Sequence, residues 1–81
     1  MPQVANSRRT SFTAIIQREG RLYVALCPEL DIASQGRSLP IARRNLQEAV
    51  ELFLETASSR EIKSRLHTET YISSMDVVVG R

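Results

Sequence analysis

The feature that most constrains this chain is the order of segments within residues 22–55. Residues 22–27 form an apolar run that ends at Pro28, and Pro28 cannot donate a hydrogen bond to a strand ladder. A short polar run follows at residues 32–35 and closes at Gly36, after which a long amphipathic segment begins. This order predicts a small module in which strands are followed by a helix.

Two further strands are expected on either side of this module. Residues 11–18 are rich in β-branched and aromatic types, and Gly20 can take the positive φ of a hairpin turn. Both faces of residues 22–27 are apolar or small, which is typical of a central strand. Residues 68–79 return to strand character and are expected to complete the sheet.

The long helix is expected to start after Ser38, a good N-cap, with Pro40 in the first turn, where a missing N–H costs nothing. Its apolar side chains recur at helical spacing and form one stripe: Ala42, Leu46, Ala49, Val50, Phe53 and Leu54. The stripe predicts an end near residues 56–57. A short helical turn is expected over residues 60–66.

A chain of 81 residues is one domain with a thin core, because a domain this small buries only roughly 60% of its unfolded surface. Residues 1–9 are expected to be a flexible N-terminal leader, and residues 10–81 a single domain. The predicted core draws on several segments: Phe12, Ile16, Val24, Leu26, Leu46, Val50, Phe53 and Leu54. The thin core and the strand edge expected near the C-terminus favour a homodimer or homotetramer.

Charge and cysteine content narrow the class of protein. The net charge is +2, and the basic residues are spread along the chain instead of forming one stripe. The two arginine doublets, Arg8-Arg9 and Arg43-Arg44, are the predicted contacts if the chain binds nucleic acid. The single cysteine excludes an intrachain disulfide and fits a reducing compartment. With no evident signal peptide or membrane span, we expect a cytoplasmic protein that binds no membrane.

No catalytic, cofactor or metal site is expected from the sequence. Cys27 and His67 stand forty positions apart and do not form a ligand cluster. We interpret Cys27 as a small core residue and His67 as a surface or junction residue; the alternative is a thiol nucleophile with His67 as its base. Glu29 and Asp31 are interpreted as parts of a solvated turn, with acid–base or metal chemistry as the alternative. The glycines do not form a phosphate loop.

Several of these residues stand in a fixed order and spacing. In sequence they are Gly20, Leu22-Tyr23-Val24-Ala25, Pro28, Leu30, Ser34-Gln35-Gly36, Ser38, Ala42, Asn45-Leu46, Glu48-Ala49-Val50 and Leu52-Phe53-Leu54-Glu55. This ordered set covers rather more than half of the chain and resembles the HicB-like antitoxin family. Residues 75–79 are similar to the closing strand of short, single-domain members.

The resemblance implies an α+β fold in the order β-β-β-α-β, a partial ribonuclease-H-like arrangement with one long helix packed across an antiparallel sheet. Family members belong to type II toxin-antitoxin systems and neutralise HicA-type toxins, small proteins that cleave messenger RNA. Many members carry an additional DNA-binding domain. Only about two dozen residues follow the long helix here, so no separate DNA-binding domain is expected.

The leading hypothesis is therefore an antitoxin-like binding protein without enzymatic activity, whose partner is a HicA-like toxin. Such toxins tend to be basic, so the predicted contacts lie on the acidic and polar segment after Pro28: Glu29, Asp31 and Gln35. The second hypothesis is a small oligomeric regulator that binds DNA or RNA directly. The third is a hydrolase that uses Glu29, Asp31 and a metal ion.

Overall fold

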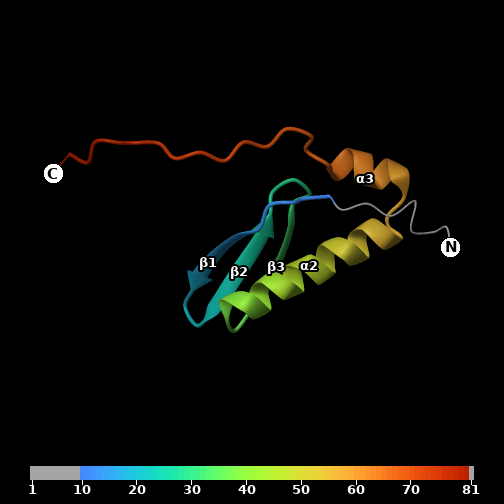
Figure 1. Cartoon of the computed structure of the whole chain (residues 1–81), viewed down its shortest axis with the longest axis horizontal. Coiled ribbons are helices and arrows are strands. Elements are labelled where there is room, and N and C mark those ends of the chain that lie inside the picture. The colour runs from blue at the N-terminus through green and yellow to red at the C-terminus, as the bar shows by residue number, and fades with distance from the viewer. Residues whose placement is uncertain (1–9, 81) are drawn as a thin grey trace.

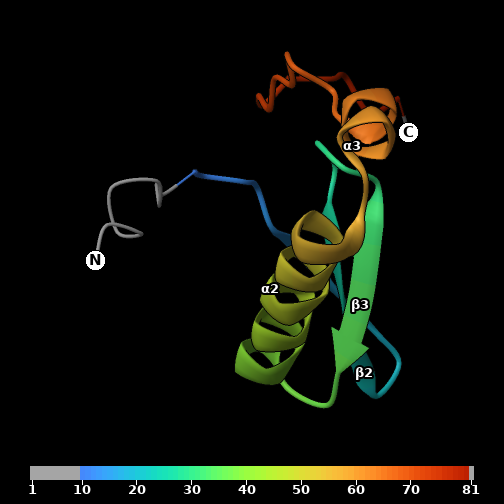
Figure 2. The same ribbon diagram turned by 90° about the vertical axis from the view of Figure 1, so that its right-hand side faces the viewer.

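The computed structural model describes residues 10–80, and the structural statements below concern those residues. The elements follow in the order β1 (Ile15–Glu19), β2 (Leu22–Cys27), β3 (Ile32–Gly36), α2 (Leu39–Thr56) and α3 (Ser59–Arg65) (Figure 1). The three strands form one antiparallel sheet with β2 at its centre, and α2 lies across one face (Figure 2). The predicted α+β class and the central position of β2 are confirmed. The predicted N-terminal leader lies outside the described residues.

Two tight turns set the register of the sheet. Gly20 has φ of +65°, and the turn it forms with Arg21 pairs Glu19 with Leu22. At the other end Cys27 pairs with Ile32 across the turn of residues 28–31. Asp31 in this turn has φ of +57°, a conformation that Asp tolerates better than most residues because its short side chain bonds locally.

The core is a single layer between the sheet and α2. Its buried members are Ala25, Cys27, Leu30, Ala42, Leu46 and Val50, and its half-buried neighbours are Phe12, Ile16, Tyr23, Ile32, Phe53 and Leu66. Among the predicted core residues, Leu46 and Val50 are buried, and Phe12, Ile16 and Phe53 pack against them.

Three predicted core residues lie elsewhere. Ala25 and Cys27 point from β2 towards α2, so Val24 and Leu26 point to the opposite face, where Leu26 is 38% exposed. Leu54 lies at the margin of the helix stripe and is 37% exposed. The prediction was wrong for Val24 and Leu26 because both faces of β2 are apolar, and a shift of one residue exchanges the faces.

The long helix begins and ends as predicted. The Ser38 hydroxyl accepts a hydrogen bond from the Ile41 N–H at 3.3 Å, and Ala57 is the C-cap. Its first turn holds no acidic residue and its last turn no basic one, so packing rather than the helix dipole stabilises it. The start of α2 lies very close to the end of β3, because a Cβ placed on Gly36 would stand 2.6 Å from the Ala42 nitrogen.

The chain then returns to the 28–31 turn through α3. A capping box between Ser58 and Glu61 starts this helix, one residue earlier than the predicted turn. At its end, the Arg65 Nε–H donates to the Leu30 carbonyl at 3.0 Å, and just after it the His67 backbone N–H donates to the Glu29 carbonyl at 2.8 Å. These bonds attach the end of α3 to the turn between β2 and β3.

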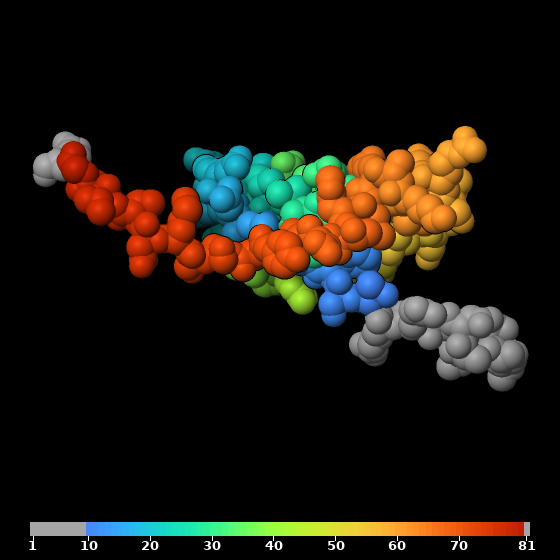
Figure 3. Space-filling view, turned by 90° about the horizontal axis from the view of Figure 1, so that it is seen from above, coloured from blue at the N-terminus to red at the C-terminus, as the bar shows by residue number. Residues whose placement is uncertain are grey.

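The predicted closing strand is not formed within the single chain. Residues 68–80 contain no helix or strand and run out beyond the sheet (Figure 1). Seen from above, the same segment extends well past the body of the molecule (Figure 3). Its side chains have the alternation of a strand, but the segment pairs with neither edge of the sheet, and strand propensity depends strongly on such context. In the described part of the chain, no helix has the length and apolarity needed to cross a membrane.

Candidate partner-binding site

The sheet face opposite α2 is an accessible surface of mixed character. Ile15, Leu26 and Ala33 form one row across the three strands, and the next row is Gln17, Val24 and Gln35. Ile15 and Leu26 are each more than one third exposed. The row of apolar side chains nearest the 28–31 turn gives this face the composition of a protein contact surface, with polar groups beside it.

Glu29 holds the start of the sheet together. Its two carboxylate oxygens accept hydrogen bonds from the Thr13 backbone N–H at 3.0 and 3.1 Å, and the Thr13 hydroxyl donates to Oε2 at 2.6 Å. The Cys27 thiol donates to Oε1 at 3.5 Å. Glu29 therefore joins the chain that enters β1 to the turn that leaves β2.

These contacts shift two pKa values in opposite directions. Partial desolvation raises the pKa of Glu29, but the hydrogen bonds from the Thr13 hydroxyl and backbone N–H outweigh it, so the pKa of Glu29 lies below its ordinary value. Burial raises the pKa of the Cys27 thiol, and the Glu29 carboxylate raises it further. Cys27 is thus held as a neutral thiol in the core, which is the opposite of an activated nucleophile.

Asp31 faces solvent beside His67. Its Oδ2 lies 3.2 Å from the His67 Nε2, and the two side chains are 68% and 55% exposed. An exposed pair of this kind contributes little to stability. The Arg65 guanidinium donates to the Asp31 carbonyl at 3.3 Å, which fixes the backbone of the turn and leaves the Asp31 carboxylate at the surface.

The three predicted contact residues therefore have different surroundings. Asp31 and Gln35 have exposed side chains, whereas the Glu29 carboxylate is occupied by Thr13 and Cys27. Although Glu29 and Asp31 belong to one turn, their carboxylates serve different partners and do not converge. Among residues 10–80, no group of three or more His, Cys, Asp or Glu side chains is placed to hold a metal ion.

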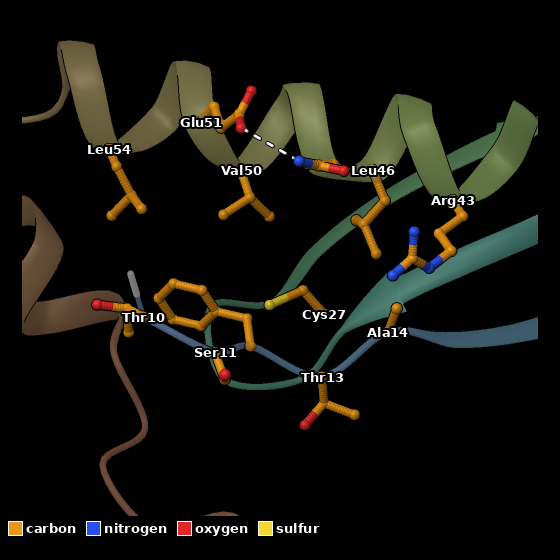
Figure 4. A pocket seen from close by; sticks show the side chains of 12 residues that line it. Thr10, Ser11, Thr13, Ala14, Cys27, Arg43, Leu46, Val50, Glu51 and Leu54 are labelled. Carbon is orange, nitrogen blue, oxygen red and sulfur yellow. Dashed lines mark hydrogen bonds between the residues drawn. The ribbon is translucent and has the colours of Figure 1, made fainter. Parts of the chain in front are cut away.

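A groove that the sequence did not predict opens between residues 10–14 and α2 (Figure 4). It has a volume of about 600 Å³. Leu46, Val50 and Leu54 point into it from the helix, and Arg43 and Glu51 stand at its rim. The sequence offered no signal for this groove, because it placed Leu54 in the core, whereas in the structure Leu54 lines the groove and is 37% exposed.

The predicted nucleic-acid contacts are only partly described. Arg43 and Arg44 are exposed on the first half of α2, and Arg43 lines the groove. Arg8 and Arg9 lie outside the described residues. Of the two arginine doublets, the structure therefore describes only Arg43-Arg44, and their joint contact with nucleic acid stays a prediction.

No family model, curated protein or solved structure matches this chain. The resemblance to the HicB-like family rests on the ordered residues between Phe12 and Glu55. Function is inferred below from those residues and from the surfaces just described.

Proposed function

We propose that this chain is an antitoxin-like protein that neutralises a HicA-type, messenger-RNA-cleaving toxin by direct contact. The observation that best supports the proposal is the accessible outer face of the β1-β2-β3 sheet, bordered by the 28–31 turn. A broad face that combines an apolar row with polar neighbours suits contact with a folded protein better than capture of a small molecule, which favours an enclosed pocket. The finer HicB-type, partial ribonuclease-H-like topology is part of the same proposal.

The toxin-contact surface consists of Ile15, Leu26, Asp31 and Gln35. The two apolar residues lie in the row nearest the 28–31 turn and supply the anchors. Asp31 lies in that turn, and Gln35 lies in the next row, on the edge strand β3. A carboxylate at the rim of an interface chiefly speeds the encounter with a basic partner. Glu29 contributes indirectly, since its bonds to Thr13 hold the turn in place.

The test requires a HicA-type toxin, which co-purification with the tagged full-length chain from its native host would supply. Replacing Asp31→Lys should slow association with that toxin by about tenfold at low salt, because it reverses a rim charge. Glu48→Lys makes the same change of charge on α2, away from the outer sheet face, and should alter the association rate much less. Surface plasmon resonance at several salt concentrations measures both.

Two results would contradict the proposal. Equal association rates for the two variants would show that Asp31 and its neighbours lie outside the interface. Recovery of nucleic acid in place of a protein, with binding that weakens steeply as salt rises, would favour the regulator hypothesis.

A further inference from the structure

The C-terminal segment, residues 69–80, exposes an unusual amount of apolar surface. The exposed fractions are 83% for Tyr71, 61% for Ile72, 84% for Met75, 67% for Val77, 96% for Val78 and 76% for Val79. Contiguous apolar surface of this kind on a small protein marks a site of interaction. The segment is extended, and its end passes beyond the body of the molecule in Figures 1 and 3.

The segment has the alternation of a strand with one buried face. In an extended chain, Tyr71, Met75, Val77 and Val79 lie on one side, together with Ser73. The other side carries Ile72, Ser74, Asp76, Val78 and Gly80. The first side is apolar at four of its five positions, so it is the side expected to face a core.

The β1 edge of the sheet has a place for such a strand. Within residues 10–80, β1 pairs with β2 alone, so the other side of β1 is a sheet edge to which a strand can be added. The groove between residues 10–14 and α2 opens at this edge and is lined by Phe12, Leu46, Val50 and Leu54 (Figure 4). The β3 edge is less suitable, because the start of α2 closes tightly over Gly36.

The segment starts at the 28–31 turn and does not pair with the β1 edge of its own chain. Hydrogen bonds from Arg65 to Leu30 and from His67 to Glu29 hold that start at the 28–31 turn. From there the twelve residues continue outward and span up to about 40 Å when extended. Within the described residues, each copy therefore has an unpaired apolar segment and an unpaired sheet edge. When two copies meet, the segment of one can pair with the edge of the other.

We propose that two copies of this chain exchange their C-terminal segments. Residues 69–80 of each copy pair along the β1 edge of the other and place Tyr71, Met75, Val77 and Val79 in the groove beneath α2. The exchange is reciprocal, so a two-fold axis relates the copies and the assembly closes as a dimer. Each sheet gains a fourth strand, and the exposed apolar residues of both copies become buried.

Two adjacent substitutions of the same kind test this arrangement. Val77→Asp places a carboxylate on the side that enters the groove and should weaken the dimer at least a hundredfold, or ~2.8 kcal/mol, because two charges are buried per dimer. Val78→Asp places the same group on the opposite side and should weaken it about tenfold or less. Light scattering over a dilution series measures both, and circular dichroism confirms that each variant is folded.

A crosslinking experiment shows whether the strand comes from the other copy. A tagged chain with Gln17→Cys is refolded together with an untagged chain with Ser74→Cys and treated with a flexible bis-maleimide. The native Cys27 is fully buried and stays in both chains. We expect a covalent product that contains one tagged and one untagged chain. Any of three results would overturn the exchange. The wild-type protein could be monomeric, the Val77→Asp variant could remain a dimer of wild-type affinity, or the mixed product could be absent.

Discussion

At the scale of single residues, Glu29 shows how far sequence reasoning reaches. The sequence indicated that Glu29 and Asp31 share a turn, and the structure places both there. The sequence could not show that the Glu29 carboxylate is bonded to Thr13, sixteen positions away, because that contact depends on how β1 pairs with β2. The Asp31 side chain is exposed, and the contact described for its carboxylate is with His67, which is itself exposed.

The hydrogen bonds of Glu29 predict a pH-dependent contribution to stability. Because its pKa is lower in the folded chain than in the unfolded one, the contribution is complete above the unfolded pKa of about 4.3 and is lost as pH falls through the folded value. Glu29→Gln should therefore lower the free energy of unfolding by about 1 kcal/mol at pH 7, and this difference should shrink towards pH 3.

Urea unfolding at a single protein concentration, repeated from pH 7 to pH 3, measures this difference. Glu48→Gln removes an exposed carboxylate from α2 and serves as the control. A difference between wild type and Glu29→Gln that stays constant over the whole pH range would show that the ionised carboxylate does not stabilise the fold.

At the scale of elements, local sequence signals predicted where the strands and the long helix begin and end. They did not determine which face of the central strand packs against the helix. Gly20, Pro28 and Ser38 each carry a backbone or capping requirement that can be read from their neighbours, and the elements begin or end beside them. Which side of β2 meets α2 depends on the whole sheet. A strand with apolar residues on both sides gave no basis for choosing Ala25 and Cys27 over Val24 and Leu26.

The close approach of β3 and α2 gives a prediction at this scale. In Gly36→Ala the new methyl group would meet the Ala42 nitrogen at 2.6 Å and the Ile41 carbonyl carbon at 2.9 Å, both of which are backbone atoms. The helix must shift to admit it, so the free energy of unfolding should fall by about 2 kcal/mol.

Gly80→Ala is the matched control, since a Cβ at that position meets nothing within 4 Å. The urea midpoints of the two variants should differ clearly at equal protein concentration. A Gly36→Ala protein as stable as wild type would mean that the start of α2 can move away from β3 without loss.

At the scale of the whole molecule, the sequence predicted a strand that one copy does not form. The alternation in residues 71–79 is a property of the chain, but pairing requires an edge that the segment can reach. The predicted self-association and the absent fourth strand have one explanation if the segment completes the sheet of a second copy. Sequence reasoning missed the groove for a related reason, because the groove depends on how residues 10–14 lie relative to α2 in the folded chain.

The measurement that tests the proposed function most directly is inhibition of a purified HicA-type toxin that co-purifies with this chain. Messenger-RNA cleavage is followed while the full-length protein is added in increasing amounts. Neutralisation by direct contact predicts that cleavage falls in proportion to the protein added and stops at a fixed stoichiometry, whatever RNA is used. Cleavage that continues at a large excess of the folded protein, or inhibition that disappears when the RNA concentration is raised, would contradict it.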